Sequence, residues 1–166
     1  MLRNPVERLY SEYLYFRHGT PQLFHQRVKN IIRETYDCLK FNTLRHCLYT
    51  PQTSNEIRLR IGVYHQHLKE YFRVFPRNQV MVIKLEDFSN NTVSYMENVF
   101  SFLDISKLNR TFLQKISDPS QHANKRKAKE RKKGEMLPET REMLENFYRP
   151  HNYILAKLLG EMFNYN

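Results

Sequence analysis

Glycine is scarce in this chain of 166 residues. It has only four glycines, each isolated from the others: Gly19, Gly62, Gly134 and Gly160. Isolated glycines cannot form a G-x-G-x-x-G or Walker loop, and they exclude collagen-like and glycine-rich linker sequences. Tryptophan is absent and only two cysteines are present, which excludes a disulfide-dense scaffold. The longest apolar run, 80–83, is far too short to span a membrane, and no signal-peptide pattern follows Met1.

Aromatic and basic residues, in contrast, are abundant. The chain has 11 Tyr and 11 Phe, which argues against disorder, and its length suits one domain with a single core. Its formal charge is +10, and seven basic residues against one acidic residue place +6 of that charge between positions 125 and 133. Such a run attracts nucleic acid, anionic membrane or sulfated glycan, although a solvated loop has the same composition.

Hydrophobic periodicity predicts a mostly helical chain with one strand. The strand, 79–85, is short, β-branched and nearly all apolar, as expected of a buried parallel strand. A lone strand needs a partner, so either Met1-Leu2 ends a second strand or the other strands lie outside this sequence. Residues 37–55 and 118–137 are predicted to be irregular. Helices are predicted at 5–17, 21–35, 56–74 and 92–103, and a short helix or turn at 106–114. Another helix is predicted to begin at 138 and to be interrupted at Pro150, with a last helix at 151–162.

The first helix begins at a capping sequence beside a possible anion site. Asn4 suits the N-cap, Pro5 the first helical position, and Glu7 the third position of a capping box. Free backbone N–H groups, the helix dipole and the Arg3 guanidinium together favour an anion. Ser11 lies nearly two turns beyond Asn4 on the same face, about 10 Å along the axis, so it and Arg3 can share one phosphate. An ordinary capped surface helix has the same pattern.

Histidines and cysteines give weaker signals. His65 and His67 lie two positions apart on a predicted helix, so they do not face each other, and no zinc-spaced cluster accompanies them; we expect no metal. One of these histidines could face a cleft and contact a substrate. Cys38 and Cys47 either close a ten-residue disulfide loop or remain free thiols. Two N-x-S/T sequons, at Asn90 and Asn109, favour a secretory lumen.

Four segments, in order, resemble the Golgi carbohydrate sulfotransferases. R-N-P-V-E-R-L-Y-S-E-Y at 3–13 resembles the family signature R-x-P-x-x-R-x-x-S-x-Y. The segments at 61–76 (followed by a strand ending L-E-D), 131–138 and 147–159 resemble its later blocks. The two-cysteine insert C-L-K-F-N-T-L-R-H-C-L-Y most resembles the branch that sulfates the 6-O position of N-acetylgalactosamine 4-sulfate.

The resemblance implies an α/β, P-loop-like fold and sulfuryl transfer from 3′-phosphoadenosine 5′-phosphosulfate (PAPS) to a sulfated glycosaminoglycan of the chondroitin or dermatan type. It also implies a place in the Golgi lumen, with an N-terminal membrane anchor. The residues that it assigns to the nucleotide are Arg3 and Ser11 at the 3′-phosphate, Arg8 on the same helix, and Arg131, Lys133 and Gly134 on a closing loop. Tyr64 and His67 are the candidate substrate contacts.

One family element is missing from the sequence. The P-K-x-G-[ST]-[ST]-like loop that cradles the 5′-phosphosulfate in relatives is absent, and in relatives it lies N-terminal to the R-x-P block, together with the general base and the anchor. We therefore expect residues 1–166 to be a partial sulfotransferase domain that does not catalyse transfer alone. The rival hypotheses are a basic helical nucleic-acid-binding module, which leaves Arg3, Ser11 and the sequons unexplained, and a non-catalytic remnant that folds poorly.

Overall fold

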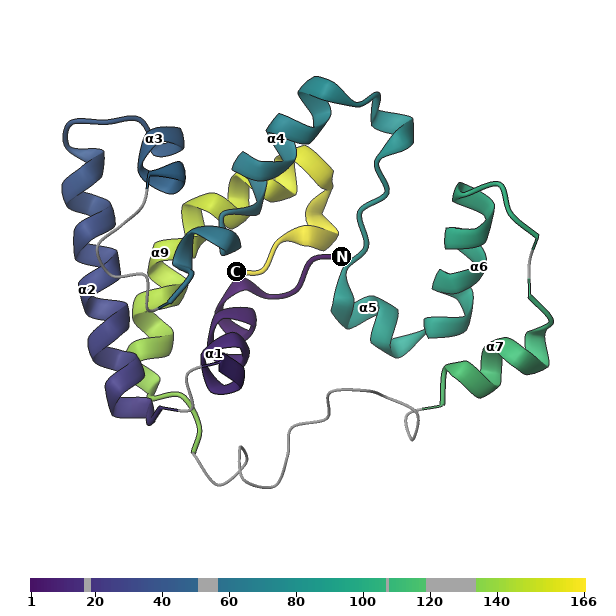
Figure 1. Cartoon of the computed structure of the whole chain (residues 1–166), viewed down its shortest axis with the longest axis horizontal. Helices are drawn as coiled ribbons and strands as arrows, with labels where there is room; N and C mark the ends of the chain where they lie inside the picture. The colour runs from purple at the N-terminus through teal and green to yellow at the C-terminus, as the bar shows by residue number, and fades with distance from the viewer. Residues whose placement is uncertain (17–18, 51–56, 107, 119–133) are drawn as a thin grey trace.

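The described part of the structure is mostly helical. The computed structural model describes residues 1–16, 19–50, 57–106, 108–118 and 134–166. Its elements, shown in Figure 1, are α1 (Pro5–Phe16), α2 (Pro21–Leu39), α3 (Leu44–Tyr49), η1 (Leu59–Gly62), α4 (Tyr64–Val74), η2 (Arg77–Gln79), α5 (Leu85–Asn90), α6 (Thr92–Phe102), α7 (Arg110–Ile116), α9 (Pro138–Leu159) and η4 (Glu161–Phe163).

Helix α9 organises the main body of the molecule. It packs against α1, α2 and α4, and Figure 1 shows these helices gathered around it. Apolar side chains at helical spacing make this core, and each large one that is fully buried contributes about 1.5–3 kcal/mol. An aromatic cluster joins α1 to α2, because the Phe24 ring lies 5.0 Å from Tyr10 and 4.8 Å from Tyr13. The largest fully buried side chains include Tyr13, Tyr148, Phe24, Leu9, Leu14, Ile31 and Leu144.

Helices α5, α6 and α7 form an arm to one side of this body (Figure 1). They pack in sequence, α5 on α6 and α6 on α7. Phe100 and Leu113 are buried, and many other apolar side chains of the arm are exposed, among them Phe102, Leu103, Ile105, Phe112 and Ile116. The two chain ends meet on the body, since Leu2 and Tyr165 pack against the same small apolar cluster.

The predicted strand at 79–85 is wrong as an element. Residues 77–79 form η2, and in the described chain the extended stretch that follows makes a single parallel bridge, between Leu2 and Lys84. The Leu2 N–H donates to the Ile83 carbonyl and the Leu85 N–H to the Leu2 carbonyl, both at 2.7 Å. A ladder needs a partner of several residues, and only Leu2 pairs here, so an apolar β-branched run does not become a strand. The side chains at 80–83 are accordingly half-buried rather than buried.

The predicted interruption at Pro150 is also wrong, because α9 continues through it. Pro150 removes one helical hydrogen bond, to the carbonyl of Asn146. Both residues lie on the exposed face, where water can satisfy that carbonyl. The buried side chains Tyr148 and Asn152, on either side of the proline, fix both halves of the helix to the body.

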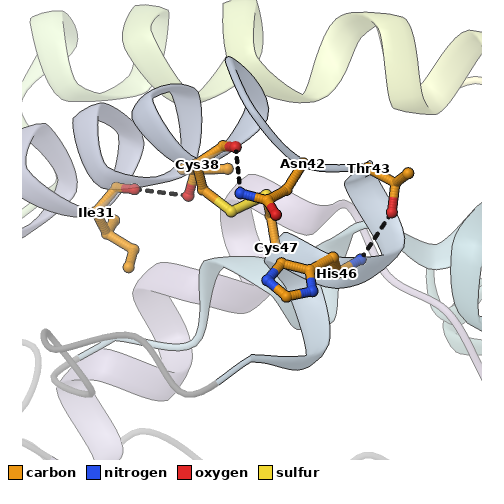
Figure 2. Close-up of a disulfide and its surroundings, with 7 residues drawn as sticks. Ile31, Cys38, Asn42, Thr43, His46 and Cys47 are labelled. Atoms are coloured by element: carbon orange, nitrogen blue, oxygen red, sulfur yellow. Dashed lines mark hydrogen bonds between the residues drawn. A yellow bond between two sulfur atoms is a disulfide. The ribbon is translucent and has the colours of Figure 1, made fainter.

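Residues 37–55 are more ordered than predicted. Helix α2 runs on to Leu39, and α3 begins after Thr43, whose Oγ1 accepts a hydrogen bond from the His46 N–H at 3.3 Å. Cys38 and Cys47 form a disulfide, which confirms that pairing, and the bond joins the end of α2 to α3 (Figure 2). Helix α5 was also not predicted. The Pro-Gln-Thr-Ser-Asn part of the segment 37–55, at 51–55, lies outside the described residues.

Candidate functional site

The start of α1 is capped, but by a different pair than the capping box predicts. Asn4 Oδ1 accepts from the N–H groups of Val6 (3.0 Å) and Glu7 (3.3 Å), which confirms Asn4 as the N-cap. The Asn4 N–H donates to Oε1 of Glu86, 2.8 Å away, in the place expected for Glu7. Glu7 instead pairs with Arg141 on α9 at 2.7 Å.

This capping changes the basis of the expected anion site. Pro5 has no N–H, and the next two N–H groups of the helix already donate to Asn4. The Arg8 N–H donates to the Asn4 carbonyl. The expectation of free backbone donors is therefore wrong, and an anion at this end of α1 depends on side chains.

Arg3 and Ser11 supply such side chains. Both residues are half-buried, and within the described chain neither the Arg3 guanidinium nor the Ser11 hydroxyl has a hydrogen-bond or ion-pair partner. The backbone of Arg3 is fixed, because the Tyr64 hydroxyl donates to its carbonyl at 2.9 Å. A held backbone with an uncommitted guanidinium suits the binding of a phosphate group.

Arg8 is placed differently from Arg3. Its guanidinium pairs with Glu12 one turn later and donates to the Arg58 carbonyl at 3.0 Å, and Arg58 pairs with the same Glu12. The Arg8 Nε is buried without a partner. Arg8 thus holds α1 against the segment before η1, an arrangement that the sequence did not indicate.

Gly134 lies against α1. The buried Tyr10 hydroxyl donates to the Gly134 carbonyl at 3.0 Å, across 124 positions of sequence. Gly134 has φ +89°, a conformation that L side chains rarely adopt, which explains glycine at this position. Arg131, Lys133 and the rest of the basic run lie outside the described residues.

A cleft of about 380 Å³ opens beside this contact. Its charged residues are Glu7, Glu135 and Arg141, and Glu7 and Arg141 form an ion pair. The remaining carboxylate makes the cleft a poor place for a phosphate. Its other lining residues are Tyr10, Met136 and Pro138.

The candidate substrate residues Tyr64 and His67 are both held by other groups. Tyr64 is buried, and its hydroxyl donates a hydrogen bond to the Arg3 carbonyl. Burial raises the pKa of the Tyr64 hydroxyl above its ordinary value. His67 has both ring nitrogens engaged, Nδ1 with the Tyr49 hydroxyl at 3.1 Å and Nε2 with the Arg60 carbonyl at 3.2 Å. Because the carbonyl can only accept, Nε2 carries the proton and Nδ1 accepts from Tyr49. These contacts give His67 a role in joining α3 to α4.

A second histidine contact was not expected. His65 is only 2% exposed, and its Nε2 lies 3.1 Å from Nδ1 of His151 on α9, with the rings stacked. Its Nδ1 is buried without a partner. Burial, followed by the nearby His151, lowers the pKa of His65 to about 4, and burial also lowers the pKa of His151. Both rings are therefore neutral near pH 7.

The sequons lie at helix boundaries of the arm. Asn90 is exposed at the end of α5. Asn109 is the exposed N-cap of α7, where its Oδ1 accepts from the Thr111 N–H at 2.8 Å. A glycan on the amide nitrogen would leave that oxygen available for capping.

The arrangement of a capped helix, a free arginine and a free serine is that of the signature noted in the sequence. The sulfotransferase domain family matches residues 1–152, and the chain belongs to this family. No group of His, Cys, Asp and Glu in the described residues is arranged to hold a metal ion, and none of the described helices is long and apolar enough to cross a membrane.

Among proteins of this family, the chain is similar to several carbohydrate sulfotransferases. Human carbohydrate sulfotransferase 15 is 35% identical over 165 residues, which is 97% of this chain and 29% of the human protein. The squid (Nototodarus sloanii) carbohydrate sulfotransferase 15 is 39% identical over 139 residues, 81% of this chain and 85% of the squid sequence. Human bifunctional heparan sulfate N-deacetylase/N-sulfotransferase 2 is 27% identical over 175 residues, 98% of this chain and 19% of that protein. The chain thus spans under a third of the length of its human relatives, and no solved structure matches it.

Proposed function

We propose that this protein acts in the transfer of a sulfuryl group from PAPS to the 6-O position of N-acetylgalactosamine 4-sulfate in a chondroitin or dermatan-type glycosaminoglycan. Membership of the sulfotransferase family and similarity to carbohydrate sulfotransferase 15 along most of the chain support the proposal. The same family membership favours this function over a nucleic-acid-binding module. We place the protein in the Golgi lumen, with a P-loop-like fold in the complete enzyme.

The observation that carries the proposal is the uncommitted Arg3 guanidinium beside a helix that also presents an uncommitted Ser11 hydroxyl. Arg3 would give two parallel N–H donors to the 3′-phosphate of the nucleotide, and Ser11 a third donor. Such charge-assisted hydrogen bonds are about twice as strong as neutral ones. Arg8, held by Glu12, would act as a positioning residue that fixes the direction of α1.

Gly134 would bring the closing loop to the same nucleotide. Its carbonyl accepts a hydrogen bond from Tyr10, one residue before Ser11, so the residue that follows the basic run contacts the helix of the proposed 3′-phosphate site. Since Lys133 and Arg131 precede Gly134 closely in sequence, this contact supports their proposed action on the bound nucleotide. The positive charge of the run would also attract the sulfated acceptor.

The test is thermal stabilisation of the 166-residue chain by adenosine 3′,5′-bisphosphate. A ligand at 100 times its Kd stabilises a protein by about 2.7 kcal/mol, which raises the Tm by several degrees. We expect Arg3→Ala to abolish the shift and Ser11→Ala to reduce it. Arg73→Ala is the matched control, because Arg73 is an exposed arginine on α4, away from α1. An unchanged shift in Arg3→Ala would contradict the proposal.

A further inference from the structure

A groove with a basic rim lies between α2 and α9. Its volume is about 440 Å³. It shares no residue with the candidate nucleotide site on α1, because every lining residue but one comes from α2 and its C-cap. The groove is lined by Lys29, Asn30, Ile32, Arg33, Tyr36, Asp37, Lys40 and Met143.

The rim of the groove is positively charged along its length. Lys29 and Arg33 lie one turn apart on α2, about 6 Å along the axis, and Lys40 follows about 10 Å beyond Arg33. Asp37 is the single acidic lining residue, and it pairs with Lys40 at 2.7 Å. Lys40 and, less strongly, Arg33 lower the pKa of Asp37. The rim therefore carries a net positive charge of two, with Lys29 and Arg33 one turn apart and free of ion pairs within the described chain.

The floor of the groove is apolar and contains an exposed aromatic ring. Ile32 and Met143 form part of it, and Tyr36, 51% exposed, stands beside them. The Tyr36 ring is held from behind, since it meets the buried Phe147 edge-on at 6.0 Å. A fixed aromatic face with a polar tip suits the apolar face and the hydroxyl groups of a sugar ring. Asn30 adds an amide that can both donate and accept.

We propose that this groove binds a sulfated segment of a glycosaminoglycan chain, as a second contact for the polymeric acceptor. The combination of a ring for the sugar, an amide for its hydroxyls and a row of cations for its sulfates determines the occupant. The choice of ligand class rests on the proposed function, whereas the groove itself does not. Two contacts on one polymer raise its effective concentration at the second contact, so a long acceptor binds more tightly than a short one.

The experiment measures binding of a fluorescent, size-defined chondroitin 4-sulfate oligosaccharide to the 166-residue chain at about 0.1 M salt, where surface charges are partly screened. We expect the double variant Lys29→Glu/Arg33→Glu, and Tyr36→Ala separately, to weaken binding by about tenfold. The matched controls are Arg149→Glu/Lys157→Glu, with the same charge change at exposed positions of α9, and Tyr71→Ala, which removes an equally exposed ring. Equal losses in test and control variants would overturn the proposal.

Two further arms separate the outcomes. Desulfated chondroitin should bind at least tenfold more weakly, and equal binding would overturn the proposal. An unlabelled single-stranded oligonucleotide of equal charge should displace the fluorescent oligosaccharide less effectively than the unlabelled oligosaccharide does. Equally effective displacement would also overturn the proposal. The groove variants should keep the full thermal shift with adenosine 3′,5′-bisphosphate, and Arg3→Ala should keep oligosaccharide binding. If only the effect of Arg3→Ala on nucleotide binding is missing, the result counts against the proposed function. If only the effect of the groove variants on oligosaccharide binding is missing, it counts against this inference.

Discussion

The backbone N–H of Asn4 donates a hydrogen bond to the side chain of Glu86, 82 positions later in the chain. This bond fixes the start of α1, and with it the backbone of Arg3, to the first turn of α5. Glu86 thus has the geometry of a positioning residue for the proposed phosphate site.

Glu86→Ala should destabilise the protein and weaken nucleotide binding. It leaves the partly buried Asn4 N–H without its acceptor, at a cost of about 1–3 kcal/mol. Glu86→Gln keeps an oxygen at the same place and should lose less. Urea unfolding together with the Kd for adenosine 3′,5′-bisphosphate measures both effects. If the two variants lost the same affinity, the positioning role would be refuted.

Gly62→Ala should destabilise the body by about 1–3 kcal/mol. An added Cβ would lie 2.7 Å from ring atoms of Tyr148, and real side chains do not approach so closely. Tyr148 cannot move away easily, because it is fully buried and its hydroxyl donates to the Leu59 carbonyl at 2.7 Å. The Tm of the variant measures this effect, and an unchanged Tm would show that the ring can shift.

Removal of the Cys38–Cys47 disulfide should cost about 2.5–3 kcal/mol, from the entropy that the closed loop removes from the unfolded chain. The double variant Cys38→Ser/Cys47→Ser tests this by chemical denaturation. Reduction of the native protein should lower its Tm as much as the double substitution does. A reductant should leave the double variant unaffected, since the described residues contain no other cysteine.

Stability should fall as the pH is lowered from about 6.5 toward 4. The pKa of buried His65 is lowered to about 4, so between these values the unfolded state binds a proton that the folded state does not. The total loss should be on the order of 3 kcal/mol and complete below pH 4, with about 2 kcal/mol already lost at pH 5. Urea midpoints at pH 7 and pH 5 measure it. His65→Asn should flatten the pH dependence, whereas His46→Gln, at an exposed position of α3, should not.

Local signals in the sequence were sufficient for the helices with a clear apolar period. Helix α1 begins at the predicted Asn4-Pro5 cap and follows the spacing of Leu9 and Tyr13. Helices α6 and α7 also lie close to the predicted ranges. In these segments the buried face is set by residues three and four apart, so sequence and structure agree.

The sequence-based predictions failed where the local structure depends on residues far away in the chain. The run 80–83 has strand composition, but its pairing depends on what lies beside it, and among the described residues that is only Leu2. Pro150 breaks an isolated helix, but packing of α9 against the body outweighs the lost hydrogen bond. Glu86 acts on Asn4 from 82 positions away, and no local pattern indicates such a contact.

The candidate site was predicted in part for the same reason. The signature placed Arg3 beside the start of the first helix and Ser11 on that helix, and within the described chain neither side chain has an intramolecular partner. It could not show that Asn4 uses the free N–H groups, or that Arg8 is engaged with Glu12. Those facts depend on side-chain geometry that composition and spacing do not determine.

The bond from Tyr10 to Gly134 has a consequence for synthesis of the protein. Helix α1 is made long before α9, yet α9 covers part of its apolar face. At 5–20 residues per second, the ribosome needs about 6–24 seconds to make the segment that separates α1 from α9. During this interval α2 can cover only part of that face, by packing its Phe24 ring on Tyr10 and Tyr13. The protein should therefore depend on chaperones while it is being translated, because the side of α1 that packs on α9 stays uncovered until α9 is made.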